Sequence, residues 1–560
     1  MRRSFASRAQ RALVFLAVGL VASFFVFGMV VPRQAATPPA ENPSVEPSAL
    51  PTPTRSPSTT PRPAPGPDDP HPGVPLVPVA QHPVWPETKV RNPDRQLGVK
   101  ATDPLEGTAK APSSDLTGYW GQQVVWQPCR TSALCTTIQV PLDWEDPGRA
   151  ALSIAMIKLP AASPTGEPIF VNPGGPGVAG LGMAETVGTD RWPGHDVIAW
   201  DPRGTGDSTH ISCGTDQQTD VLRALDTTPD DDAEKQALID GWAGFARLCR
   251  DEAGDLLDHV TTIEVTRDMD LMRYLVGAKK LNFFGVSYGT YLGAMYAELF
   301  PDRAGRLLLD SAVEITNDEN APSQAEGFEL ALDNYAKWCA GQTTCRLGGT
   351  ESEVLGTVDG FLSGLDADPV RVGDRKLTQS LGLVGILMFL YADESAYKYL
   401  TFAINEAMQG RGEVLLEAAD ELDGRGTHFA SFPAMSCADW PDDGVDAAFK
   451  ELEKIRAKAP IVGKHMGVQP VCETWTANSA PQLRITGQGA PPIVVVGTTG
   501  DSATPYQHAV TMAEQLVSGA LVTFEGAGHG SVLGNNACLA KAARDFMVDG
   551  VVPADGTRCR

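Results

Sequence analysis

The stretch "LNFFGVSYGTYLGAMYAELFP", residues 281–301, constrains the fold of this chain more than any other segment. An apolar, aromatic run is followed by Gly-Val-Ser-Tyr-Gly and then by small and apolar residues at helical spacing, which predicts strand, turn and helix. In that order the pentapeptide holds Ser287 on a sharp, strained turn. We expect Gly285 and Gly289 to be needed because a side chain at either position would clash where strand and helix pass closely. The pentapeptide also occurs by chance, so an ordinary Gly-rich bend stays open as the alternative.

Further apolar runs alternate with helical segments. The segment "TTIQVPLDWEDPGRAALSIAMIKLPA" predicts two strands joined by an Asp-Pro-Gly turn. More strands are predicted in "EPIFVNPGGPGVAG", "HDVIAWDPRGTGDS", "RLLLDSAV", "PPIVVVGTTGD" and "ALVTFEGAGHG". Because these strands are apolar throughout and separated by helices, we expect an α/β fold with a mostly parallel sheet covered by helices on both faces.

The strand rhythm stops between Val313 and Ala480, where the pattern is helical. We therefore expect a first core part at 116–315, an inserted helical cap at 316–480 and a C-terminal core part at 481–560. Ligands of open α/β sheets bind at the carboxyl ends of the strands. The cap is predicted to lie over that edge.

The N-terminus carries basic residues before an uncharged apolar run, Ala12 to Val31. This pattern is typical of an export signal, and 20 apolar residues are also long enough for an uncleaved membrane anchor. Both interpretations of residues 1–31 place the rest of the chain outside the cytoplasm. Residues 32–115 are predicted to be a Pro/Ser/Thr-rich linker, because 18 of the 44 prolines fall between Pro32 and Pro86.

The ten cysteines suit an exported protein and lie as near neighbours at 129 and 135, 213 and 249, 339 and 345, 437 and 472, and 538 and 559. Sequential pairing would close five loops, although sequence does not fix connectivity. With no Cys-x-x-Cys pair, a zinc ribbon is not indicated, and we expect neither metal nor cofactor. The net charge of −24 disfavours nucleic acid and anionic lipid as partners.

A serine nucleophile on such a turn needs a base and an acid that follow it in the order Ser, Asp or Glu, His. His529, in "GAGHG", follows a strand on a flexible loop, whereas His508, in "TPYQHAVTMAEQL", is predicted to lie on a helix surface. We therefore expect His529 to be the base. Asp501 and Asp310 both end apolar runs, and Asp501 is preferred as the acid because it follows the cleaner strand nearer to His529.

An oxyanion hole should combine the amide after the nucleophile, Tyr288, with an amide from the loop after an earlier strand. "NPGGPG", residues 172–177, is that loop, and Gly175 is the expected second donor. A plain tight turn, the other interpretation, would not explain its position.

Together "NPGGPG", "DPRGTGDS", "GVSYGTYLG", "GTTGDSATP" and "GAGHG" resemble the α/β-hydrolase peptidases related to prolyl aminopeptidase, most of all the secreted bacterial tripeptidyl aminopeptidases. The likeness covers about Leu116 to Arg560. Prolyl aminopeptidases have His-Gly-Gly-Pro-Gly where this chain has Asn172-Pro173 before Gly174, which fits the tripeptidyl branch better. The resemblance implies a serine aminopeptidase with the α/β-hydrolase fold and a bracing role for Thr504 beside Asp501.

An aminopeptidase must bind a free ammonium group, and Asp439 and Glu473 are the candidate substrate-binding acids. If Cys437 and Cys472 pair, both acids project from one stapled patch. Two alternatives remain at this stage: a carboxylesterase or lipase acting on envelope esters, and a non-catalytic binding protein on a hydrolase scaffold.

Overall fold

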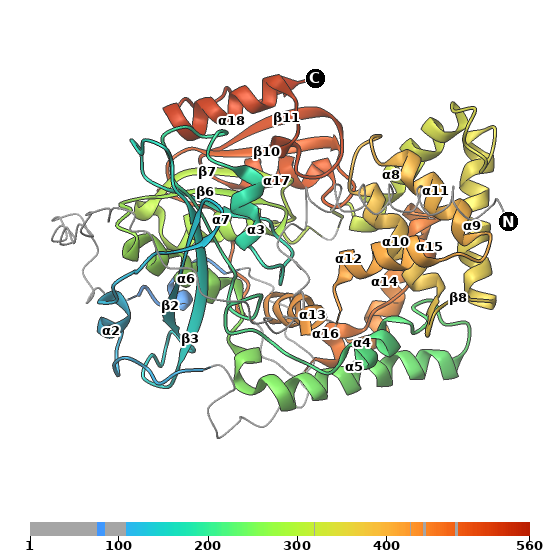
Figure 1. Cartoon of the computed structure of the whole chain (residues 1–560), viewed down its shortest axis with the longest axis horizontal. Helices are drawn as coiled ribbons and strands as arrows, with labels where there is room; N and C mark the ends of the chain where they lie inside the picture. Colours follow the sequence, from blue (N-terminus) through green and yellow to red (C-terminus); the bar gives the residue numbers. More distant parts are fainter. Residues whose placement is uncertain (1–75, 85–107, 319, 426, 441–443, 476–479) are drawn as a thin grey trace, which may run out of the picture.

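The computed structural model describes residues 76–84, 108–318, 320–425, 427–440, 444–475 and 480–560. A ten-stranded sheet in the order β1-β2-β3-β5-β4-β6-β7-β10-β11-β12 lies in the left part of the molecule as drawn in Figure 1. Its strands are β1 (Gln127–Arg130), β2 (Ala133–Pro141), β3 (Ala151–Leu159), β4 (Ile169–Asn172), β5 (Val197–Trp200), β6 (Leu281–Val286), β7 (Ala304–Asp310), β10 (Ile493–Gly500), β11 (Gly519–Ala527) and β12 (Thr557–Cys559). The strands from β5 to β12 in this order pair in parallel, whereas β1, β2 and β3 pair antiparallel.

Helices cover both faces of the sheet, as the apolar strands predict. The core helices are α2 (Thr117–Trp120), α3 (Leu181–Val187), α4 (Asp216–Arg223), α5 (Asp232–Ala253), α6 (Thr262–Leu275), α7 (Tyr288–Leu299), α17 (Tyr506–Gln515) and α18 (Ala537–Asp549). Phe284 and Leu308 pack with α3 and α18 on one face, and Phe283 and Leu307 pack with α6, α7 and α17 on the other. Neighbouring residues of one strand thus enter different cores, because side chains alternate along a strand.

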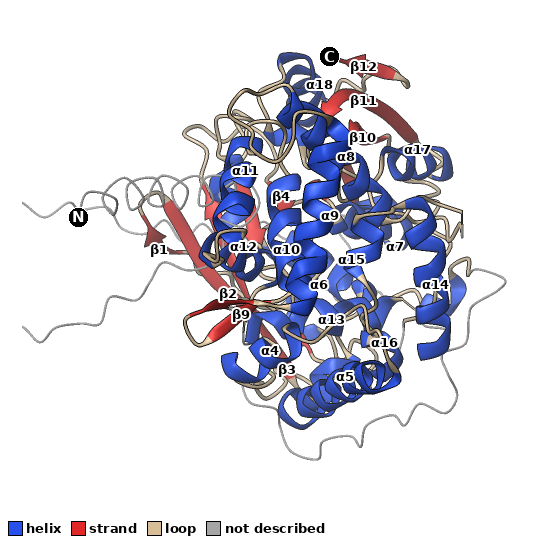
Figure 2. Cartoon of the chain, turned by 90° about the vertical axis from the view of Figure 1, so that its right-hand side faces the viewer, coloured by secondary structure: helices blue, strands red, loops and turns tan. Residues whose placement is uncertain are grey.

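A helical cap interrupts the sheet between β7 and β10. It contains α8 (Gln324–Ala340), α9 (Glu351–Ala367), α10 (Gln379–Leu390), α11 (Tyr397–Ala407), α12 (Glu413–Asp423), α13 (Thr427–Asp439), α14 (Val445–Lys458), α15 (Val462–Met466) and α16 (Val471–Thr474). Helices α8 to α12 share an apolar core of their own beside the sheet (Figures 1 and 2). The sequence pattern missed a short antiparallel pair inside this region, β8 (Val370–Val372) and β9 (Arg375–Leu377).

The folded body begins before the predicted boundary at residue 116. The Ala109 amide donates to the Ala151 carbonyl at 2.9 Å, and Val84 bridges to Leu483. Parts of the predicted linker therefore contact the body through backbone hydrogen bonds, which the proline content did not indicate. The predicted signal or anchor at 1–31 and most of the linker lie outside the described residues. Among the residues that are described, no helix has the length and apolar character needed to cross a bilayer.

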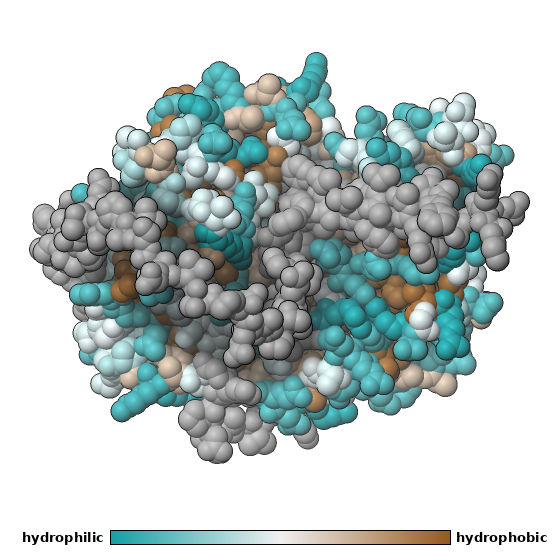
Figure 3. All heavy atoms as spheres, in the orientation of Figure 1, coloured by the Kyte–Doolittle hydropathy of each residue, from teal (hydrophilic) through white to brown (hydrophobic). Residues whose placement is uncertain are grey.

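Outside the grey residues, hydrophilic residues predominate on the face drawn in Figure 3, and hydrophobic residues occupy smaller areas of it. This distribution agrees with the net charge of −24.

Five disulfides join the cysteines in the sequential pattern: Cys129–Cys135, Cys213–Cys249, Cys339–Cys345, Cys437–Cys472 and Cys538–Cys559. The Cys213–Cys249 bridge closes the longest loop, with a sequence separation of 36, and both of its sulfurs are buried in the core.

We expect the alanine double variant of Cys213 and Cys249 to lose about 4 kcal/mol of the free energy of unfolding, because a cross-link restricts the unfolded chain more as its loop lengthens. The matched double variant of Cys129 and Cys135, with a separation of 6, should lose only about 2 kcal/mol. Urea unfolding of both variants measures the difference. A larger loss for the short loop would contradict this order.

Candidate active site

Ser287 lies on the turn between β6 and α7 with φ 58° and ψ −126°, a conformation that side chains rarely adopt. An added Cβ on Gly285 would lie 2.3 Å from the Gly289 carbonyl oxygen, and one on Gly289 would lie 2.9 Å from the Asn172 carbonyl oxygen. The predicted steric role of both glycines is therefore confirmed. The Ser287 amide donates to the Asp310 carbonyl at 3.0 Å, which holds the turn against the end of β7.

Asp501 and His529 are in contact at the ends of neighbouring strands. Asp501 follows β10, His529 follows β11, and Oδ1 of Asp501 lies 2.8 Å from Nδ1 of His529. Both side chains are buried, with exposed fractions of 1% and 6% for the whole residues. Since Nδ1 is directed at the carboxylate, Nε2 is on the opposite side of the imidazole ring.

The same oxygen of Asp501 also accepts the amides of Ala503 and Thr504, at 3.0 and 2.9 Å. The Thr504 hydroxyl lies 3.3 Å from Nδ1 of His529. The Thr504 amide therefore bonds the acid that the family resemblance expects Thr504 to brace, and the Thr504 hydroxyl lies beside the imidazole. These bonds fix the carboxylate in one orientation, as an acid that orients a histidine requires.

His508 lies apart from this pair on α17, where its Nε2 bonds the Pro322 carbonyl at 2.8 Å. It is buried rather than on the helix surface, because the loop before α8 covers it. Asp310, the alternative acid, bonds the Val532 amide through Oδ2 at 2.8 Å. Burial raises the pKa of the Asp310 carboxyl to about 7.

The glycine-rich loop 172–177 lies against the Ser287 turn. An added Cβ on Gly174 would lie 2.9 Å from Cβ of Ser287 and 3.0 Å from the amide nitrogen of Tyr288. The Gly174 amide donates to Oδ1 of Asn172 at 2.9 Å and is therefore already bonded. The next candidate for an oxyanion donor in the loop is the Gly175 amide. Tyr288 is the first residue of α7, and the first amides of a helix have no acceptor inside it. The loop thus brings Gly174 close to the first amide of a helix, and Gly175, the expected donor, is the next residue of the loop.

Asp439 is tied to the chain itself. Its Oδ1 accepts the Thr262 amide at 2.8 Å and its Oδ2 accepts the Thr262 hydroxyl at 2.6 Å, at the start of α6. The same hydroxyl contacts the Tyr288 phenol, and burial together with the Asp439 charge raises the pKa of Tyr288 well above its ordinary value. Asp439 is thereby linked to Tyr288 through the Thr262 hydroxyl, a contact that the sequence did not predict.

Glu473 lies on α16 and is partly exposed. The Cys437–Cys472 bridge, with a Cα–Cα distance of 4.9 Å, joins α16 to α13. The disulfide between Cys437 and Cys472, on which the prediction of a shared patch depended, is therefore present. Asp439, at 2% exposure, is nevertheless far more buried than Glu473.

A family model described as TAP-like protein matches residues 459–559. The chain is 34% identical over 477 residues to the serine protease Hip1 of Mycobacterium tuberculosis, an alignment that covers 78% of this chain and 91% of Hip1. This chain belongs to the α/β-hydrolase serine peptidase family that includes Hip1.

Two further relatives carry different names. The tripeptidyl aminopeptidase of Streptomyces lividans is 28% identical over 453 residues, which cover 76% of this chain and 83% of that protein. Carboxylesterase B of Mycobacterium tuberculosis is 32% identical over 498 residues, which cover 82% and 95%. Membership of this family makes the chain a serine hydrolase. The names of the two further relatives leave peptides and esters as the two candidate classes of substrate.

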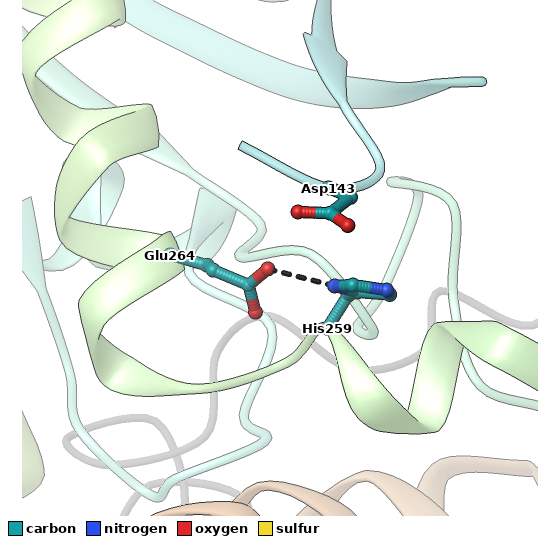
Figure 4. Close-up of side chains that lie close together, drawn as sticks. All are labelled: Asp143, His259 and Glu264. Carbon is teal, nitrogen blue, oxygen red and sulfur yellow. Dashed lines mark hydrogen bonds and ion pairs between the residues drawn. The ribbon is translucent and has the colours of Figure 1, made fainter. Parts of the chain in front are cut away.

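A second group of titratable side chains, Asp143, His259 and Glu264, lies near the start of α6 (Figure 4), with its ligand atoms within 4.8 Å of one another. Oε1 of Glu264 bonds Nδ1 of His259 at 3.0 Å and lies 3.6 Å from the Arg203 guanidinium. Arg149 approaches Nε2 of His259 at 3.5 Å. Arg203 also bonds Asp268 at 2.7 Å, and Arg149 pairs with Asp255. Because these contacts tie the group to its neighbours, we interpret it as part of the frame around α6.

We expect Gly174→Ala to lower kcat by at least about 10²-fold, because the new methyl group would occupy the space in front of the Tyr288 amide and displace an oxyanion donor. Steady-state kinetics on a peptide reporter measures the change. Gly356→Ala is the matched control, since an added Cβ on Gly356 in α9 meets nothing within 4 Å. The control should keep wild-type kcat, and a Gly174→Ala enzyme with wild-type kcat would contradict the predicted oxyanion loop.

Proposed function

We propose that this chain is an exported serine aminopeptidase that releases short, tripeptide-sized fragments from the N-termini of peptides through an acyl-enzyme. The catalytic residues are Ser287 as nucleophile, His529 as base and Asp501 as the orienting acid. The single observation that carries the proposal is the 2.8 Å contact between Asp501 and His529 at the sheet edge where Ser287 stands on its strained turn.

In the reaction, Oγ of Ser287 attacks the scissile carbonyl carbon and Nε2 of His529 takes the hydroxyl proton. The oxyanion accepts hydrogen bonds from the amides of Tyr288 and Gly175. His529 returns the proton to the leaving amine as the carbon–nitrogen bond breaks. Water, activated by His529, then hydrolyses the acyl-enzyme and frees Ser287. Asp501 orients His529 and stabilises the imidazolium that forms in each step.

The substrate ammonium group requires a carboxylate near the cap. Of the two predicted acids, Glu473 suits this role better because it is partly exposed, whereas Asp439 is 2% exposed and bonded to Thr262. The tripeptide preference is supported by the relative named tripeptidyl aminopeptidase.

The proposed location is extracellular or in the cell envelope. Five disulfides support it, because disulfides persist in oxidising compartments. The basic residues and apolar run at 1–31 add the sequence of an export signal or anchor.

Ser287→Ala and His529→Ala should each remove most activity and leave similar residual rates, because members of a triad act as a unit. Asp501→Asn should lower kcat by about 10⁴-fold through the wrong imidazole tautomer. Reporter kinetics and fluorophosphonate labelling measure these losses, with circular dichroism as the folding check. A folded His529→Ala enzyme that keeps wild-type kcat would contradict the assignment.

Acetylating the N-terminus of a tripeptide reporter should lower kcat/KM by about 10-fold or more, because a hydrogen bond to a charged group contributes roughly 1.5–3 kcal/mol. Glu473→Gln should reduce kcat/KM for the free peptide and leave the acetylated peptide unchanged. Equal turnover of blocked and free peptides by the wild type would refute the aminopeptidase.

The second candidate function, a carboxylesterase, is favoured by the relative of that name. Parallel kinetics on tripeptide anilides and short p-nitrophenyl esters separate the two. A large kcat/KM advantage for the esters would make the esterase the better description.

A further inference from the structure

Asp310 is the last residue of β7. It contacts the turn at Ser287 and also the histidine loop, residues 528–533, which follows β11. Its carbonyl accepts the Ser287 amide at 3.0 Å, and its Oδ2 accepts the Val532 amide at 2.8 Å. The side chain is fully buried, and its Oδ1 has no hydrogen-bond partner among the described residues. A buried carboxyl with one unpaired oxygen is costly and calls for a specific explanation.

Ser311, the next residue, bonds the same loop. Its hydroxyl accepts the Gly530 amide at 2.8 Å, while its own amide donates to the Val496 carbonyl of β10 at 3.0 Å. Ser311 has φ 58°, a conformation that glycine would adopt without strain. The strained residue supplies a hydroxyl that glycine lacks.

Two more residues hold the loop from other sides. Nη1 of Arg191 donates to the Val532 carbonyl at 2.7 Å, and the Tyr391 carbonyl accepts the His529 amide at 3.0 Å. The Tyr391 ring lies edge-on to the imidazole, with ring centroids 5.5 Å apart. Hydrogen bonds therefore restrain the loop at His529, at Gly530 and at Val532.

We propose that Asp310 and Ser311 form a platform at the end of β7 that positions the base, His529, by fixing the loop that follows it. The inference rests on the proposed function, in which His529 is the base. Asp310 acts through the loop because Nδ1 of His529 is bonded to Asp501 and not to Asp310. It is a positioning residue, and its effect should fall on kcat rather than on KM.

The ionisation of Asp310 adds an electrostatic effect. The charged groups that face it are His529, Asp501 and Arg191. Because burial raises the Asp310 pKa from 3.8 to about 7, this carboxyl is protonated below about pH 7 and negative above it. The negative form should stabilise the imidazolium that catalysis generates.

The first experiment compares Asp310→Ala, Asp310→Asn, Ser311→Ala and Ser311→Gly in reporter kinetics. Asp310→Ala should lower kcat by about 10²-fold with little change in KM, since a displacement of about 1 Å can cost that much. Asp310→Asn keeps an acceptor for Val532 and should recover at least about 10-fold of that loss. Ser311→Gly should lose kcat as Ser311→Ala does, although it relieves the backbone strain. Wild-type kcat in folded Asp310→Ala and Ser311→Gly would overturn the proposal.

The second experiment follows the ratio of wild-type kcat to Asp310→Asn kcat from pH 5 to pH 9. The ratio should be smallest below pH 7, where both side chains are neutral, and should grow as Asp310 ionises. A purely structural role would leave the ratio constant, and a constant ratio overturns the proposal.

The contribution of Asp310 to the stability of the folded state should fall as the pH rises, whereas the kcat ratio grows. The raised Asp310 pKa stabilises the folded state fully below about pH 4, and this contribution is lost as the pH rises through 7. Asp310→Asn should therefore gain unfolding temperature relative to the wild type between pH 4 and pH 8. A difference in unfolding temperature that does not change with pH would contradict the ionisation of this buried group.

Asp196→Asn is the matched control, because the Asp196 carboxylate also accepts a single backbone amide, that of Ala161 at 2.8 Å. It should keep wild-type kcat and a flat kcat ratio. His529→Ala separates the two hypotheses. An active His529→Ala enzyme would defeat the proposed function, whereas an inactive one beside fully active Asp310 and Ser311 variants would defeat only the platform.

Discussion

The parallel register of β6, β7, β10 and β11 is the constraint on which the site depends. Val286 pairs with Asp310, Asp310 pairs with Val496, and β10 pairs with β11 over most of its length. Because parallel strands end at one edge, their following residues emerge side by side. Ser287, Ser311, Asp501 and His529 occupy that edge.

The cap also contacts the residues of this edge. In α8, an added Cβ on Gly327 would lie 2.5 Å from the Ser502 carbonyl, beside Asp501. In α13, the Phe432 amide lies within 2.6 Å of a Cβ added to Gly177, at the end of the glycine-rich loop 172–177, and Phe432 is 55% exposed. Helix α10 ends at Leu390, and the carbonyl of the next residue, Tyr391, accepts the His529 amide. The cap therefore fixes the backbone of the site as well as bordering it.

Buried acids around the site act mainly on backbone amides. Asp439 accepts the first amide of α6, Asp501 accepts two amides of its own loop, and Asp310 accepts one from the histidine loop. A buried carboxylate is tolerated where donors satisfy it. Two of these acids, Asp501 and Asp310, thereby bond the loops that follow β10 and β11.

The sequence by itself determined the local features of this protein: the strained turn at Ser287 with its two glycines, the strand-end positions of Asp501 and His529, and the antiparallel pair β2 and β3. These follow from periodicity and turn chemistry within a few residues. The sequence did not determine which acidic side chains face a substrate and which bond backbone amides of the protein itself. Asp439 and its partner Thr262 are 177 residues apart, and Asp310 and Val532 are 222 apart. Only tertiary structure decides such contacts, because no local pattern encodes which amide a distant carboxylate will meet.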